Sequence, residues 1–253
     1  MAEYKVNGLD LFAEQFKAFT DNYIIVGGTA CYLAMREAGL GFRTTKDIDM
    51  IITVEEISHA FGERFWDFIR KGGYKFYEKD GVSHYYRFIN PTDNTYPAML
   101  ELFSRKQDMF MESKGGTFTP IVIDEEISSL SAIMLDDEYY SFLKSGKELI
   151  DSISILQPTH LIAFKAKAHV DLTNKKSSGM QINERDLKKH KHDVFRLVQL
   201  LTAAERINAV EKIKNDVREF LALVKDENIN MKQLGVTITQ EEAENVIKEV
   251  FEL

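Results

Sequence analysis

Residues 23–53 have the sequence YIIVGGTACYLAMREAGLGFRTTKDIDMIIT, and this stretch decides the fold. Its first four residues are aromatic or β-branched, which is typical of a buried strand. Gly27 and Gly28 then turn the chain, residues 29–38 have a helical pattern, and residues 47–53 have the composition of a second strand. The predicted order is therefore strand, glycine turn, helix and strand.

The remaining patterns divide the chain into a sheet-rich part and a helical part. We expect helices over residues 9–19 and 55–70, and strand-like segments over residues 74–77, 83–89, 99–103, 117–123, 128–135 and 139–155. From Pro158 the periodicity is helical almost to the end, apart from a break around residues 228–239. The sequence thus predicts an α/β (α+β) fold, with a mixed-sheet domain over residues 1–156 and a helical domain over residues 157–253.

Composition limits the class of protein. The longest apolar runs fall far short of the roughly 20 residues that span a bilayer, and the N-terminus lacks a basic region followed by an apolar run. We therefore expect a cytoplasmic protein without a membrane partner, and a single cysteine, Cys31, that serves as a small core residue. The formal charge of −8 argues against broad binding to nucleic acid, although residues 185–192 form a dense local basic run.

Two aspartates in the second predicted strand are candidate metal ligands. Asp47 and Asp49 lie two residues apart, so their side chains point to one face while the apolar residues between and after them face the core. Adjacent carboxylates repel unless a cation lies between them, and Mg²⁺ prefers oxygen ligands. Glu101 has similar apolar neighbours in a strand-like run, and a third carboxylate would allow two metals. The alternative is a solvated strand end.

The glycine turn is a candidate phosphate site. Gly27, Gly28 and Thr29 follow a strand and open a helix, where backbone N–H groups can hold phosphate oxygens. The threonine hydroxyl is a further donor or a helix cap. The residues that lead into the aspartates also suit triphosphate charge, namely Arg43, Thr45 and Lys46. A tight turn and a solvated loop remain the alternatives.

The helical part contributes a lysine and an aspartate. Lys165 lies on an apolar helix face with Leu161, Ala168 and Leu172, so its ammonium needs an anionic partner, either a structural carboxylate or a bound phosphate. Asp193 precedes an apolar periodic run and is either a helix-start acid or a group that orients Lys165 or acts as a base.

These stretches resemble a known superfamily. The run from Val26 to Ala30, followed by residues 43–50, is similar to the signature of the DNA polymerase β nucleotidyltransferase superfamily. Residues 160–168 and 189–197 are similar to its AbiEii-type branch, which includes the toxin halves of bacterial toxin-antitoxin and phage-defence systems. The resemblance touches both parts of the chain, over residues 23–201.

The resemblance implies an enzyme and its site. It implies that Gly27, Gly28 and Thr29 grip a nucleoside triphosphate, that Asp47 and Asp49 hold Mg²⁺ or Mn²⁺, and that Lys165 and Asp193 complete the site. The expected reaction moves a nucleoside monophosphate to an acceptor hydroxyl on an RNA end, a protein or a small molecule. A cognate antitoxin is the expected protein partner.

Two rival functions remain at this stage. An Asp-x-Asp glycosyltransferase that uses nucleotide sugars also holds metal with paired aspartates, but it leaves the glycine turn, Lys165 and Asp193 unexplained. A catalytically inactive relative that binds a nucleotide or a partner protein is the other alternative.

Overall fold

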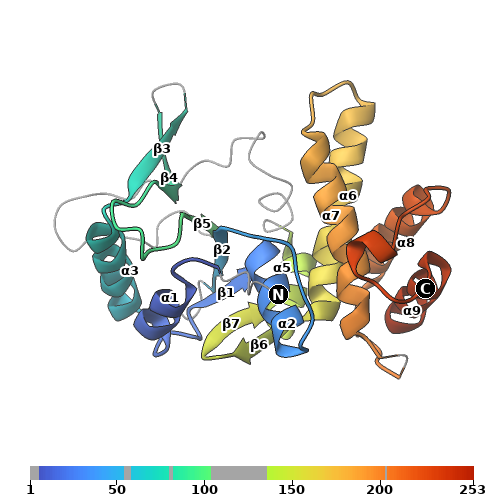
Figure 1. The fold of residues 1–253 in the computed structure, drawn as a ribbon, viewed down its shortest axis with the longest axis horizontal. Helices are drawn as coiled ribbons and strands as arrows, with labels where there is room; N and C mark the ends of the chain where they lie inside the picture. Colours follow the sequence, from blue (N-terminus) through green and yellow to red (C-terminus); the bar gives the residue numbers. More distant parts are fainter. Residues whose placement is uncertain (1–5, 54–57, 80–81, 104–135, 203) are drawn as a thin grey trace. The chain divides into compact units, whose positions relative to one another are not determined.

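The computed structural model describes residues 6–53, 58–79, 82–103, 136–202 and 204–253 (Figure 1). These residues form an α/β protein with one seven-stranded mixed sheet, in the strand order β3-β4-β5-β2-β1-β7-β6. The chain folds into two compact units: the first contains the described residues of 1–33, 43–127 and 147–156, and the second contains those of 34–42, 128–146 and 157–253. The chain therefore passes between the units several times, once between Leu156 and Gln157.

The centre of the sheet is formed by four short strands. β1 (Tyr23–Val26) pairs antiparallel with β2 (Asp47–Ile52) and parallel with β7 (Ile153–Leu156), while β2 pairs parallel with β5 (Met99–Phe103). All side chains of β1 and β7 are buried, as expected for strands that are not at the edge of the sheet. The predicted strands at residues 23–26 and 99–103 are confirmed with the same bounds.

The outer strands and two helices complete the first unit. β3 (Lys75–Lys79), β4 (Val82–Ile89) and β6 (Lys147–Ile150) each pair antiparallel with their neighbours. α1 (Leu9–Phe16) and α3 (His59–Gly72) bring aromatic rings together with β1, and the fully buried members are Phe12, Phe16, Tyr23, Phe61, Phe65 and Phe68. Stacked and edge-to-face pairs of this kind contribute about 0.5–1.5 kcal/mol each beyond area burial.

α2 (Gly27–Glu37) starts directly at the end of β1. There is no loop between them, because Gly27 has a φ of +69° and turns the chain at a single residue. Apolar side chains of α2, including Cys31 and Leu33, are fully buried, so the predicted core position of the cysteine is confirmed. The strand, glycine turn, helix and strand predicted from residues 23–53 are all present.

The second unit is helical. Its helices are α5 (Asp137–Ser145), α6 (Pro158–Ser177), α7 (Glu184–Leu197), α8 (Glu211–Val224) and α9 (Gln240–Phe251), with short 3-10 turns at Val198–Leu200 and Lys232–Leu234. α6 and α7 lie side by side over much of their length in Figure 1. Pro158 occupies the first turn of α6, where its missing N–H costs no helical hydrogen bond.

Several predicted elements need correction. Residues 139–145 are helical rather than strand-like, because Asp136 caps α5 by accepting hydrogen bonds from the backbone N–H groups of Glu138 and Tyr139. α6 ends at Ser177 and α7 begins at Glu184, so six residues connect them. The strands predicted at residues 117–123 and 128–135 lie outside the described residues. Among the helices described, none has the length and apolarity needed to cross a membrane.

Candidate functional site

The glycine turn lies against the carboxylate of Asp49. Because β1 and β2 are antiparallel, Val26 at the end of β1 pairs with Asp49 near the start of β2. A Cβ added to Gly27 would overlap Oδ2 of Asp49 and would lie 3.1 Å from its Cγ. Only a glycine fits here, both for this reason and because its φ is positive. The structure therefore brings the predicted phosphate turn and one predicted metal ligand together.

Gly28 faces the residues that lead into β2. A Cβ at Gly28 would lie 2.7 Å from Oγ1 of Thr45 and 3.2 Å from a guanidinium nitrogen of Arg43. The next residue, Thr29, is fully buried, and its hydroxyl donates a 2.5 Å hydrogen bond to the backbone carbonyl of Asp47. The threonine thus links the start of α2 to the start of β2. Lys46, which directly precedes β2, is exposed. A cation and a hydroxyl therefore flank the backbone of the turn.

The three predicted carboxylates occupy adjacent strands. Asp47 and Asp49 are half-buried, with the fully buried Ile48 between them, so the predicted alternation along β2 is confirmed. Asp49 pairs in register with Glu101 on β5. Glu101 is ion-paired with Nε of Arg87 on β4, so its carboxylate already has a cationic partner.

The two aspartates suit a magnesium ion that is also bound by substrate. Among the residues described, no group of three His, Cys, Asp or Glu side chains is placed to hold a metal. Mg²⁺ nevertheless needs only one or two protein carboxylates when phosphate oxygens and water supply its other ligands. The donor chemistry of Asp47 and Asp49 fits such a site, whereas Glu101 would first have to leave Arg87.

Lys165 and Asp193 form a buried ion pair in the helical unit. Nζ of Lys165 on α6 lies 3.2 Å from Oδ2 of Asp193 on α7, and both side chains are almost completely buried. Nη1 of Arg196 lies 3.2 Å from the other carboxylate oxygen, Oδ1. Asp193 therefore neutralises two cations, which supports its predicted role of orienting Lys165. Because α7 starts at Glu184, the alternative of a helix-start acid is wrong.

Arg196 was missed by the sequence analysis. Its guanidinium lies 5.9 Å from the centroid of the Phe42 ring, which adds a cation–π contact to its ion pair. The only signal in the sequence is the spacing of three residues from Asp193, which places both side chains on one side of α7. The cluster thus consists of the buried Lys165 and Asp193 and the half-buried Arg196.

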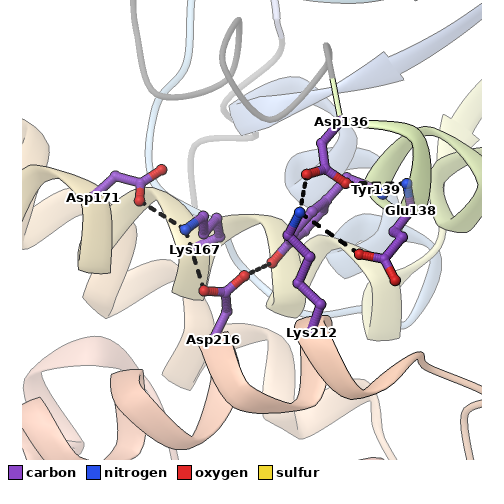
Figure 2. A network of polar contacts seen from close by, with 7 residues as sticks. All are labelled: Asp136, Glu138, Tyr139, Lys167, Asp171, Lys212 and Asp216. Atoms are coloured by element: carbon purple, nitrogen blue, oxygen red, sulfur yellow. Dashed lines mark hydrogen bonds and ion pairs between the residues drawn. The ribbon is translucent and has the colours of Figure 1, made fainter.

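A second network in the helical unit surrounds Lys167 (Figure 2). Nζ of Lys167 lies 2.9 Å from Asp171 and 3.2 Å from Asp216, and the hydroxyl of Tyr139 donates a 2.8 Å hydrogen bond to Asp216. Lys167 is therefore half-buried and ion-paired with two carboxylates. Burial raises the pKa of Asp171, although the ammonium of Lys167 opposes that change.

His160 is another buried group that the sequence did not single out as functional. Its ring stacks on Phe142 at a centroid distance of 4.1 Å, and its Nδ1 lies 2.9 Å from Nε2 of Gln157. Burial lowers its pKa to about 4, so the ring is neutral at pH 7. His160 lines a cavity of about 580 Å³ between α5, the start of α6 and residues 206–213. Its partners make it a structural residue of the helical unit.

No family model, no curated protein and no solved structure matches this chain.

Proposed function

We propose that the chain is a metal-dependent nucleotidyltransferase that moves a nucleoside monophosphate from a triphosphate to an acceptor hydroxyl. One observation carries the proposal: the Gly27–Gly28 turn at the start of α2 lies against Asp49, Thr45 and Arg43. A phosphate-binding backbone and a carboxylate metal ligand are then neighbours within one unit, which is the arrangement that triphosphate chemistry needs. The sequence resemblance to the AbiEii-type branch supports the same reaction.

In this proposal, the residues around the glycine turn and the start of β2 have distinct roles. Backbone N–H groups at the start of α2 bind the triphosphate tail, helped by the positive end of the helix dipole. The guanidinium of Arg43 adds charge beside the turn, and the Thr29 hydroxyl keeps the turn and β2 in register. Asp47 and Asp49 hold Mg²⁺ or Mn²⁺, which when bound supplies Lewis-acid stabilisation of the reacting phosphate.

The proposed reaction is a nucleophilic substitution at the α-phosphorus. The acceptor oxygen forms a bond to the α-phosphorus, the bond from that phosphorus to the bridging oxygen breaks, and pyrophosphate leaves. The hydroxyl proton passes to solvent or to a basic group. Lys165 and Asp193 belong to the helical unit, and their assignment to catalysis rests on the sequence resemblance, as does an antitoxin partner.

A catalytically inactive relative that binds a nucleotide is the second candidate. The observation that favours it is the ion pair between Glu101 and Arg87, which occupies the third carboxylate. Binding of triphosphate without turnover in the presence of magnesium or manganese would establish this alternative.

Transfer of a radiolabel tests the proposal. The full chain is incubated with Mg²⁺ or Mn²⁺, each α-labelled nucleoside triphosphate and bacterial total RNA, and label is followed on RNA, on protein and on small molecules. We expect transfer by the wild type, and at least a hundredfold loss (about 3 kcal/mol) in Asp49→Asn. The matched control is Asp67→Asn, which removes a half-buried carboxylate on α3 that pairs only with Lys71 among described residues. Equal turnover in Asp49→Asn and wild type would overturn the mechanism.

A further inference from the structure

A row of ionisable side chains crosses three neighbouring strands of the sheet. Arg87 on β4 pairs directly with Glu101 on β5, and Glu101 is in register with Asp49 on β2. Residues that pair across neighbouring strands have their side chains on the same face of the sheet. One cation and two anions therefore lie on one face, and each of the three residues is half-buried. We call Arg87, Glu101 and Asp49 the charged row.

The opposite face of these strands belongs to the apolar core. The sequence neighbours of the charged row are Phe88, Leu100 and Ile48, which pair with one another across the same strands. All three are almost completely buried. Apolar packing on that face therefore stabilises the register that places Arg87 beside Glu101.

The guanidinium of Arg87 occupies the carboxylate of Glu101. Nε of Arg87 is ion-paired with Oε1 of Glu101, and the side chain of Glu101 is only 16% exposed. An arginine is effectively always protonated, and a carboxylate at this depth is destabilised when it loses its partner, so the pair is persistent. A divalent ion that used Glu101 as a ligand would have to displace this guanidinium. In agreement with this, no three His, Cys, Asp or Glu side chains among the described residues are arranged to hold a metal.

The charge of Arg87 also acts on the neighbouring aspartates. Neighbouring strands lie about 4.8 Å apart, so two strand spacings, about 10 Å, separate the backbones of Arg87 and Asp49. At this range a fixed positive charge in a partly buried site still repels a divalent ion. Arg87 therefore opposes metal binding in two ways, by pairing with Glu101 and by repulsion.

We propose that Arg87 is a positioning residue that keeps Glu101 out of the metal site, so that Asp47 and Asp49 alone bind the divalent ion. The inference deepens the proposed function and rests on it for the metal, but metal binding is measurable without turnover. Two carboxylates hold Mg²⁺ or Mn²⁺ weakly unless phosphate oxygens complete the shell of the ion. The charged row thereby couples metal binding to the arrival of the triphosphate, whose negative charge offsets that of the guanidinium.

Binding of Mn²⁺ to the full chain without triphosphate tests the role of Arg87. The affinity is measured from the electron paramagnetic resonance signal of free Mn²⁺. We expect Arg87→Gln to bind Mn²⁺ at least about tenfold more tightly than the wild type, because Glu101 joins the aspartates and the repulsion is removed. The matched control is Lys147→Gln, which removes a cation that is ion-paired with Asp21 on β6, at the edge of the same sheet.

A double variant keeps the test valid if Arg87→Gln is poorly folded. Arg87→Gln/Glu101→Gln removes both charges, so neither partner is left unpaired. We expect it to bind Mn²⁺ about as the wild type does, because the net charge of the row is unchanged and Glu101 is not a ligand. A tenfold weaker affinity would show that Glu101 is already a metal ligand in the wild type, which overturns the inference. Circular dichroism establishes that each variant is folded.

The remaining outcomes separate this inference from the proposed function. Equal affinities of the wild type and Arg87→Gln, or an equal gain in Lys147→Gln, overturn the role of Arg87, and transfer of label by the same wild type leaves the proposed function standing. The expected affinities in a chain that never transfers label retain the role of Arg87 and overturn the transferase. Binding that Asp49→Asn does not weaken in the Arg87→Gln background overturns both, because the metal then binds elsewhere.

Discussion

Gly27 and Asp49 are in direct contact across β1 and β2, with no space for a Cβ between the glycine and the carboxylate. The glycine is also held at a φ of +69°. The same residue therefore turns the chain into α2 and sets the distance from the start of that helix to a candidate metal ligand. Any side chain at this position must displace the carboxylate or the turn.

Gly27→Ala is the first test of this contact. The substitution adds a left-handed strain of about 1–2 kcal/mol and a clash with Asp49, so we expect weaker triphosphate binding and a lower free energy of unfolding. Gly39→Ala is the matched control, because Gly39 has a φ of +72° and has nothing within 4 Å of an added Cβ. Triphosphate binding is measured by calorimetry and stability by thermal unfolding. The difference between the two variants then gives the effect of the contact with Asp49, because both share the backbone strain. Equal effects of the two substitutions would show that the contact with Asp49 contributes nothing.

Local sequence signals were enough to predict this part of the molecule. The β-branched run of β1, the two glycines and the alternation around Ile48 are each set by neighbours within a few residues. Their meeting does not follow from these signals, because a helix usually connects two parallel strands, and a parallel second strand would begin at the opposite end of the sheet from Gly27. What the sequence could not supply is the antiparallel register that places Val26 opposite Asp49.

The errors have both local and tertiary causes. Tyr139, Tyr140, Phe142 and Leu143 have the composition of a strand, yet they form one buried face of α5 once Asp136 caps that helix. Arg196 and the partners of Lys167 were missed because Phe42 and Asp216 are distant in sequence. Local helix spacing could predict only the pairs of Arg196 with Asp193 and of Lys167 with Asp171.

In the cluster around Asp193, removal of the carboxylate should reduce stability more than removal of the Lys165 ammonium. Asp193→Leu leaves the buried Lys165 and the half-buried Arg196 without their shared carboxylate, so we expect a loss of about 3–5 kcal/mol in the free energy of unfolding. Lys165→Met leaves Asp193 paired with Arg196 and should cost about 2 kcal/mol. The double variant should recover part of the loss caused by Asp193→Leu. Urea denaturation measures all three, and a larger loss for Lys165→Met than for Asp193→Leu would contradict this account.

The network around Lys167 predicts that half-buried ion pairs contribute more to stability than exposed ones. Lys167→Met leaves Asp171 and Asp216 without their shared cation, so we expect a loss of about 2 kcal/mol at pH 7. The loss should be smaller at pH 5, because burial already raises the pKa of Asp171 and removal of the ammonium raises it further. Lys212→Met is the control, since Lys212 pairs with Asp136 and Glu138 at an exposed position and should change stability little. Identical losses for the two lysines would reject the distinction.

His160 predicts how the helical unit responds to acid. Burial lowers its pKa from 6.5 to about 4, so between these values the unfolded chain binds a proton that the folded chain does not. Stability therefore falls as the pH drops from about 6.5 towards 4, and the contribution of one such histidine is on the order of 2–3 kcal/mol. His160→Gln removes the titration but keeps a polar group beside Gln157 and Ser145. Urea unfolding at a series of pH values should show a shallower decline in the variant than in the wild type, while the other buried histidines continue to titrate in both. Parallel curves for the two proteins would mean that His160 titrates alike in the folded and unfolded chains, and that its stacking on Phe142 does not keep it neutral.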